Sequence, residues 1–277
     1  MLEIDILKYM IKKVLLLFFI FCGVGLNAQK SIEIGLFGGT SYYLGDLNPG
    51  FHFRQPDVAY GAVARYNINP RWAMKLSIYR GKLKGDDATT KANEDRNLGF
   101  ESKITDFSYV VELNFFDYVT GSTRNSLTPY IFAGVSVFLF KPTSGGADLN
   151  AMGTEGQNVG YDGRSPYKLF SFAIPFGIGF KYSLNKRLGV AFEWGMRKTF
   201  TDYIDDVSKT YYLDGESINR NDQAQVLSDP TFDHKPGMQR GDPKTKDWYN
   251  FTGISITYKI NLSNNFKCTD FGNRKKY

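Results

Sequence analysis

The sequence contains few of the residues that build disulfides, metal centres and catalytic dyads. Its 277 residues include only two cysteines and two histidines. After residue 28 it also lacks any apolar run near the roughly 20 residues that a transmembrane helix needs. A fold stapled by several disulfides and a bundle of membrane-spanning helices are therefore excluded.

An export signal is predicted at the N-terminus. Lys12 and Lys13 precede an apolar stretch that runs from Val14 to Leu26, and the small residue Ala28 precedes polar sequence. A basic start, a short apolar segment and a small residue at its end are typical of a secretory signal, so we expect residues 1–28 to be removed. The alternative, a membrane anchor, is disfavoured because the run is too short to span a bilayer.

Removal of this signal peptide has a consequence for the cysteines. Cys22 leaves with it, and Cys268 stays as a single thiol in an oxidising compartment. An unpaired cysteine there favours either an idle free thiol or a bond to another protein. Cys268 is therefore a candidate partner contact.

The charge pattern gives no sign of a nucleic-acid partner. The chain has 34 basic and 28 acidic residues, and they are scattered through polar segments without a basic stripe or helix. Aromatic residues are abundant, with 18 tyrosines and 23 phenylalanines. In an exported protein this content favours contact with membrane lipids, since aromatic side chains gather at membrane interfaces.

The clearest structural signal is a strict alternation over residues 170–182. Phe, Ile and Tyr occupy every second position, and the intervening positions hold Ser, Ala, Pro, Gly and Lys. Alternation of this kind predicts a β-strand. A face of small residues opposite a face of large apolar ones is typical of a small closed barrel whose large side chains face lipid.

Seven further segments have the same period, which gives about eight strands. They span residues 32–37, 58–66, 72–78, 106–115, 130–140, 188–197 and 253–260. In 130–140 both faces are apolar, so its inward side cannot be assigned from the sequence.

The lengths of the connections alternate between short and long. Short ones are expected at 67–71, 117–126 and 183–187, and long ones at 44–57, 83–103, 141–166 and 201–247. Short periplasmic turns with four long outer loops are typical of outer-membrane barrels. We therefore predict an all-β fold, a single antiparallel up-and-down transmembrane β-barrel over residues 29–260, with both termini and a tail, residues 261–277, in the periplasm.

The predicted inward face carries charges of both signs. They are Glu33, Arg65, Lys75, Asp106, Glu112, Lys181, Glu193, Arg197 and Lys259. An eight-stranded barrel has room inside only for side chains, so we expect these charges to pair with one another. The barrel is then plugged and not a pore; the alternative is a narrow proton or ion path.

No catalytic, cofactor-binding or metal site is predicted. His52 and His234 fall in predicted outer loops, and without a nucleophile motif we interpret them as solvated residues rather than as part of a barrel enzyme. Asp202, Asp205 and Asp206 could bind calcium, but they lack the glycine and glutamate of a calcium loop. A capped, solvated loop is favoured there.

Several phrases at strand ends are more specific than a β-barrel requires. They are Tyr43–Pro49, Arg65–Arg71, Glu112–Phe116, Thr128–Gly134, Thr199–Ser208, Arg240–Pro243 and Asp247–Tyr249. Together they resemble the DUF6089 family, which includes the PorG-type barrels of the type IX secretion system of Bacteroidetes. The resemblance runs from about Glu33 to Ile260.

This resemblance implies an accessory of protein export that docks a periplasmic ring of PorK-like lipoproteins and PorN-like proteins. The expected partners are thus outer-membrane lipids and ring proteins, with no nucleic acid and no small-molecule substrate. The alternative is a small OmpA-like barrel that acts as an adhesin, receptor or structural protein of the envelope.

Overall fold

Residues 31–91 and 93–262 are described in a computed structural model of the protein. The strands are β1 (Ser31–Leu44), β2 (Asp57–Asn67), β3 (Trp72–Asp86), β4 (Gly99–Asn114), β5 (Leu127–Ser144), β6 (Ala147–Asp148), β7 (Phe170–Ser183), β8 (Leu188–Thr199) and β9 (Trp248–Asn261). The helices are short: α2 (Asp87–Thr90), α3 (Leu149–Met152), α4 (Gln223–Ser228) and the 3₁₀ turns η1 (Tyr161–Gly163) and η2 (Gly215–Ser217). None in the described ranges is long and apolar enough to span a bilayer. The predicted signal peptide and Cys268 lie outside the described residues.

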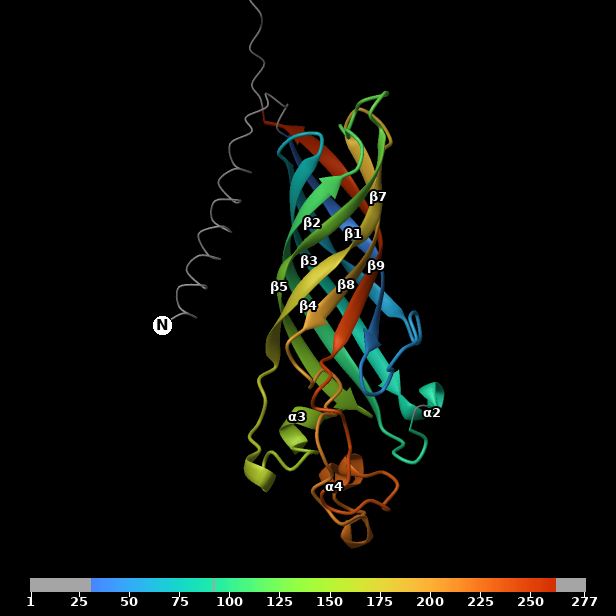
Figure 1. The fold of residues 1–277 in the computed structure, drawn as a ribbon, viewed down its shortest axis with the longest axis vertical. Coiled ribbons are helices and arrows are strands. Elements are labelled where there is room, and N and C mark those ends of the chain that lie inside the picture. Colours follow the sequence, from blue (N-terminus) through green and yellow to red (C-terminus); the bar gives the residue numbers. More distant parts are fainter. Residues whose placement is uncertain (1–30, 92, 263–277) are drawn as a thin grey trace, which may run out of the picture.

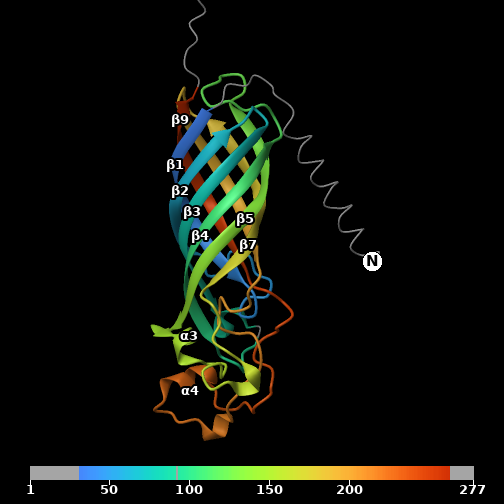
Figure 2. The same cartoon turned by 90° about the vertical axis from the view of Figure 1, so that its left-hand side faces the viewer.

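Hydrogen bonding closes the eight long strands into a ring. Each pairs antiparallel with the next long strand along the chain, and β1 pairs with β9 along its whole length. The two-residue β6 pairs only with β5 and adds a short hairpin at its end. Both side views show a closed cylinder of tilted strands (Figures 1 and 2). The predicted antiparallel up-and-down barrel is confirmed.

In β7 the two predicted faces separate cleanly. Phe172 and Ile174 are exposed on the outside, whereas Ala173 and Pro175 are buried inside. Pro175 has no backbone N–H to donate, and the β5–β7 ladder is interrupted between Ala173 and Phe176. The alternation in this strand therefore corresponds to the two faces of the barrel wall, with the large apolar residues outside and the small residues inside.

The inward side of residues 130–140, which the sequence left open, is set by the aromatic residues of β5. Tyr130, Phe132 and Phe138 are buried in the interior, while Val135 and Leu139 are exposed on the outside. Both faces are apolar because the barrel interior here is itself packed with rings. Burial of these rings, and not polarity, distinguishes the two faces.

Large apolar side chains surround the outside of the cylinder on every long strand. Examples, each at least 40% exposed, are Ile34, Leu36, Val58, Tyr60, Leu76, Ile78, Phe107, Tyr109, Val135, Leu139, Phe172, Ile178, Phe192, Ile254 and Ile256. So much contiguous apolar surface is unfavourable in water and favourable against lipid tails. A closed barrel with this outer belt is the architecture of outer-membrane β-barrels.

The two ends of the barrel differ. The short-turn end carries the connections 68–71, 115–126 and 184–187 and both ends of the described chain, while the loop end carries 45–56, 87–98, 145–169 and 200–247 (Figure 1). Three strands extend into segments that were predicted as the loops 83–103 and 141–166. β3 continues to Asp86, β4 begins at Gly99 and β5 ends at Ser144, because their polar outward residues lie beyond the apolar belt and still pair.

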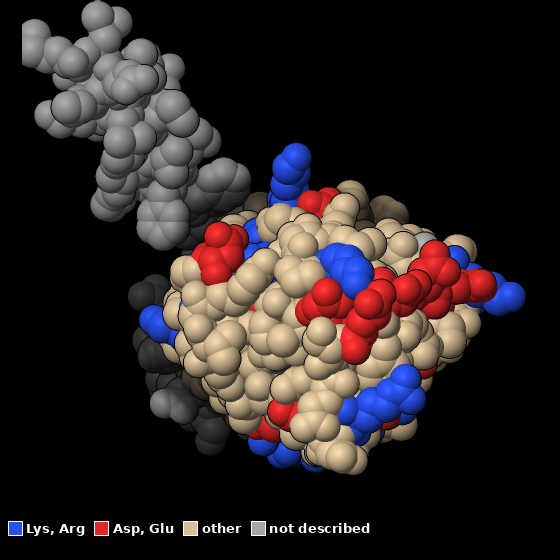
Figure 3. Space-filling model, turned by 90° about the horizontal axis from the view of Figure 1, so that it is seen from below, with Lys and Arg blue, Asp and Glu red and all other residues tan. Residues whose placement is uncertain are grey.

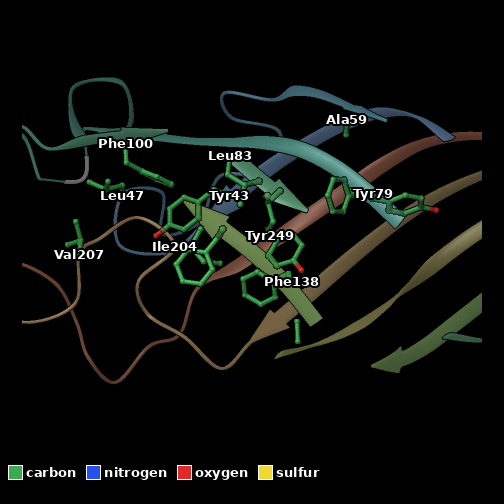
Figure 4. Packing of buried hydrophobic residues seen from close by; sticks show 14 of the residues in the cluster. Tyr43, Leu47, Ala59, Tyr79, Leu83, Phe100, Phe138, Ile204, Val207 and Tyr249 are labelled. Carbon is green, nitrogen blue, oxygen red and sulfur yellow. The ribbon is translucent and has the colours of Figure 1, made fainter. Parts of the chain in front are cut away.

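Aromatic side chains fill the interior of the barrel toward the loop end. Phe37 stacks on Tyr79 with 4.2 Å between ring centroids, and Phe138 meets Tyr249 edge-on at 5.1 Å. Ile204, from the last long loop, packs into the same cluster (Figure 4). This packing joins the barrel interior to the loops above it.

Candidate functional site

The middle of the barrel interior holds a network of buried charges centred on Glu112. Its carboxylate lies 2.8 Å from Arg65 Nε, 2.6 Å from Lys181 Nζ and 3.5 Å from Lys75 Nζ. All four side chains are almost fully buried. Ionised groups in such a place are stable only when every charge has a partner, and here one carboxylate serves three cations.

Two further carboxylates balance those cations. Glu33 lies 2.9 Å from Arg65 Nη1, and Glu193 pairs with Lys75 and accepts a hydrogen bond of 2.8 Å from Tyr79 Oη. The network therefore contains three acids and three bases and is neutral as a whole. It spans the interior from β1 to β8 and occupies the space that a pore would need.

Three of the nine predicted interior charges do not join this network. Asp106 accepts a hydrogen bond from Tyr249 Oη at 2.7 Å, and the Arg197 guanidinium lies 4.8 Å from the centroid of the Phe251 ring. Lys259 is only half-buried and donates to the backbone oxygen of Thr120 at 2.6 Å. The expectation that all nine charges pair with one another is wrong for these three. Hydroxyl groups lie nearest to Asp106, a backbone oxygen and aromatic rings nearest to Arg197, and a backbone oxygen nearest to Lys259.

The second short connection, residues 115–126, folds into the barrel mouth at the short-turn end. Thr120 Oγ1 donates to Glu33 Oε1 at 2.6 Å, and Gly121 N donates to Ser183 Oγ at 2.7 Å. Gly121 has a φ of +96°, and a Cβ there would lie 2.5 Å from the Lys186 carbonyl oxygen. This plug turn, residues 115–126, closes the interior from the short-turn side.

The four long loops form one packed cap at the loop end (Figure 2). Arg96 pairs with Asp87 at 2.7 Å, donates to the Arg240 backbone oxygen at 2.6 Å and donates to the Asp46 backbone oxygen at 3.0 Å. Arg240 in turn lies 3.1 Å from Glu155. Both guanidinium groups are buried, so each ties several loops together. Viewed from this end, the cap covers the barrel mouth (Figure 3).

Sequence reasoning did not identify this cap. Arg96, Arg240 and Glu155 are isolated charges in three loops that are far apart along the chain. Only their partners reveal their role, and no spacing in the sequence brings those partners together.

The acidic group in the last loop is buried, and the expectation of a solvated loop is wrong. Asp202 accepts a hydrogen bond of 2.6 Å from Ser208 Oγ, and Asp205 accepts one of 2.6 Å from Tyr43 Oη. Asp206 is fully buried and accepts a hydrogen bond of 2.6 Å from Tyr167 Oη. The loop folds inward because these carboxyl groups find hydroxyl donors in the cap and barrel. In the described part of the chain, no cluster of three or more His, Cys, Asp or Glu side chains is arranged to hold a metal ion.

Burial changes the acidity of these loop carboxyls. It raises the pKa of Asp202 to about 7 and that of Asp206 to about 6. The pKa of Asp205 is raised well above its ordinary value by burial and by the neighbouring charge of Asp247. The cap thus contains acids that are protonated at pH values where surface carboxyls are ionised.

Neither histidine stands in a catalytic arrangement. His52 Nδ1 lies 3.0 Å from Tyr42 Oη at the barrel rim. His234 is only partly exposed; its Nδ1 lies 2.9 Å from Asp229 Oδ1 and 3.3 Å from Thr231 Oγ1. A serine-type triad needs the acid and the hydroxyl on opposite ring nitrogens, whereas here both face the same one.

The solved structures to which this chain is similar have little sequence in common with it. Solved structures with similar folds include the attachment invasion locus protein Ail of Yersinia pestis in complex with sucrose octasulfate, at 9% identity and a TM-score of 0.40, covering 83% of this chain and 97% of Ail. Neisserial surface protein A has 11% identity and a TM-score of 0.42 over 83% of this chain and 97% of its own. OprG of Pseudomonas aeruginosa has 14% identity and a TM-score of 0.38 over 84% and 98%.

Among proteins with curated functions, none matches this chain. One family does match, a domain of unknown function designated DUF6089, over residues 12–269. The match includes all the strands, the plug turn and the cap. The chain belongs to the DUF6089 family.

Proposed function

We propose that this protein is the outer-membrane barrel of a type IX protein secretion machine and that it anchors a periplasmic ring of PorK-like and PorN-like proteins. The phrases that resemble PorG-type barrels and the DUF6089 match support this assignment. In this role the barrel is neither an enzyme nor a conduit.

The filled interior is the observation that carries the proposal. The charge network around Glu112, the aromatic cluster, the plug turn and the cap leave no lumen of porin size through the described residues. A barrel without a lumen can act only through its lipid-facing surface and its two ends. An anchoring role requires no more than that.

The proposed orientation rests on the difference between the two ends of the barrel. Short turns and both chain termini belong on the periplasmic side of an outer-membrane barrel, and long loops on the outside. β9 includes Asn261, so the predicted tail, residues 261–277, begins at least one residue later than expected, and in the proposed orientation it belongs on the side of the ring. Cys268 in that tail is the candidate contact.

Affinity purification of the full chain from envelopes of its host tests the proposal. The expected result is that the ring lipoprotein and its partner co-purify, and that deletion of residues 262–277 removes them while the barrel stays heat-modifiable on gels. Absence of ring proteins from the purified intact barrel would overturn the proposal.

The covalent part of the contact has its own readout. Non-reducing gels are expected to show a heavier band that disappears with reductant and in Cys268→Ser. If the ring co-purifies without such a band, the contact is non-covalent and Cys268 is an idle thiol.

The second candidate is a small envelope barrel of the OmpA type that acts as an adhesin or receptor. The compact cap favours it, because an anchor does not need ordered outer loops. Deletion of loop residues 212–236 separates the two, since a receptor loses ligand binding while an anchor keeps its ring.

A further inference from the structure

Three lysines stand side by side on the outer wall of the barrel. In the β3–β4 ladder Lys82 lies opposite Lys103, and in the β4–β5 ladder Lys103 lies opposite Lys141. Their side chains point outward and are partly or largely exposed. Like charges directly opposite one another destabilise a sheet. A bound anion would therefore stabilise this lysine row, which consists of Lys82, Lys103 and Lys141.

The ion pairs of the row are uneven. Lys82 lies 2.8 Å from Glu101, and Lys141 lies 3.0 Å from Asp148. Lys103, in the centre, makes no ion pair with any described residue. Glu101 belongs to the next row toward the loops, opposite Lys84. The acids therefore lie on the loop side of the row, and the membrane side is left basic.

The row lies directly beyond the apolar belt. Two residues nearer the membrane, the same strands place Arg80 opposite Thr105, and two residues nearer still they place Ile78 opposite Phe107. The outward face thus changes from apolar to basic within one strand. This is the level at which lipid headgroups meet a barrel.

Two grooves lie on this wall of the barrel, one at the row and one beyond the level of Arg80 and Thr105. A polar groove of about 790 Å³ on the loop side is lined by the three lysines of the row and Lys84, and its acidic residues are Asp86, Glu101 and Asp148. An apolar groove of about 750 Å³ on the membrane side is floored by Ala62 and Ala64 and walled by larger side chains. The small alanines of β2 make the hollow, because the neighbouring outward residues of β3 and β4 are large.

The spacing between the two features fits one lipid. Leu76, in the wall of the apolar groove, precedes Lys82 by six residues on β3. That is roughly 20 Å along a strand and about 15 Å along the membrane normal for a tilted strand. This distance is close to half the thickness of the apolar band of such barrels, which is roughly 25 Å, and one lipid leaflet covers that half.

We propose that β2, β3, β4 and β5 form a binding site for a phosphate-bearing lipid of the outer leaflet. Its phosphate lies on Lys82, Lys103 and Lys141, and one acyl chain lies in the groove over Ala62 and Ala64. The site rests on the orientation given under the proposed function, with the loops outside, but not on the ring. Bound phosphate relieves the repulsion within the lysine row.

Native mass spectrometry of the full mature barrel, in the absence of any periplasmic partner, tests this site. The probes are bis-phosphorylated lipid A, the same lipid without phosphates, and glucosamine phosphate without acyl chains. We expect retention of the first probe only. Equal retention of the dephosphorylated lipid would overturn the phosphate contact, and equal retention of the chain-free sugar would overturn the lipid.

Variants locate the site. Lys103→Gln is expected to weaken lipid A binding roughly fivefold, because each lysine near an anionic surface contributes about that factor to the affinity. The triple change of Lys82, Lys103 and Lys141 to Gln is expected to weaken it on the order of a hundredfold. The matched control replaces three exposed lysines outside the row, Lys91, Lys186 and Lys244, with Gln. This variant is expected to bind lipid A as the wild-type barrel does. Unchanged binding by Lys103→Gln in a folded barrel would overturn the proposal, even if the triple variant failed to assemble.

Filling the groove gives an independent measurement. Ala64→Phe is expected to reduce retention of lipid A without changing the lysines. Because this assay needs only the isolated barrel, loss of ring docking does not affect it. A barrel that binds lipid A but no ring leaves this site standing and overturns the proposed function.

Discussion

Arg65 Nε lies 2.8 Å from Glu112 Oε2 in the centre of the barrel, and neither side chain is reached by solvent. Removing the charge of Glu112 leaves Arg65 and Lys181 without their shared partner. Breaking a buried pair in this way destabilises a protein by about 3–5 kcal/mol, so Glu112→Gln should lower stability by that amount. Urea unfolding of the barrel in detergent measures it.

The exposed Glu101 is the control for that change. It lies 2.8 Å from Lys82 in a pair that water reaches, and such pairs contribute about 0–1 kcal/mol. Glu101→Gln is therefore expected to unfold near the wild-type urea concentration. Equal losses in the two variants would show that the interior network does not stabilise the barrel.

Leu76 tests the lipid-facing belt. It is 58% exposed on β3, in the middle of the apolar outward residues of that strand. Leu76→Arg should destabilise the assembled barrel by about 2–4 kcal/mol, because a cation near the bilayer midplane loses its hydration. Leu184→Arg, at the short-turn end, should cost about 0–1 kcal/mol. Folding in lipid vesicles checks both, and an equal effect of the two changes would contradict the position of the belt.

Gly121 tests the plug turn. Its φ of +96° and the nearby Lys186 carbonyl oxygen make any side chain strained, so Gly121→Ala should destabilise the turn by at least about 1 kcal/mol. Hydrogen exchange of residues 115–126 is expected to speed up. Gly38, where a Cβ would meet nothing within 4 Å, provides the matched control. Unchanged protection in Gly121→Ala would contradict the strain.

The raised pKa values of the cap carboxyl groups predict a pH dependence of the stability of the cap. Burial raises the pKa of Asp46 to about 6 and that of Asp202 to about 7, above the ordinary 3.8. Between the ordinary pKa and the raised pKa of these groups, the folded cap binds more protons than the unfolded loops. The stability of the cap therefore falls as the pH rises through this range. Limited proteolysis of the outer loops should be slower at about pH 5 than at about pH 8.

Asp202→Asn supplies the check on this dependence. The amide cannot titrate, so the variant should lose part of the difference between the two pH values. Faster proteolysis at the lower pH in the wild-type barrel would contradict the assignment of raised pKa values.

The strands could be predicted from the sequence because one face of each is lipid-exposed and the other confined. In β7, large apolar residues such as Phe172 and Ile174 occupy every second position, and this alternation alone predicts which face lies on the outside. The ends of β3, β4 and β5 were missed because Lys84, Lys103 and Lys141 resemble loop residues. A strand that leaves the membrane keeps its ladder but loses its apolar outward face.

The cap was beyond sequence reasoning for a different reason. Asp205 is buried because Tyr43, which is 162 residues away, donates to it, and Arg96 because its acceptors include the Arg240 backbone. A polar residue in a loop is solvated by default. Only the folded structure reveals partners so distant in the chain.

A barrel closed by its own side chains passes no steady current, and planar bilayers measure this most directly. The purified full-length barrel should give no large, stable conductance steps, and Glu112→Asp, which keeps the central charge, should give none either. Reproducible channels of porin size from the folded wild-type barrel would contradict the filled interior, and with it the anchoring role.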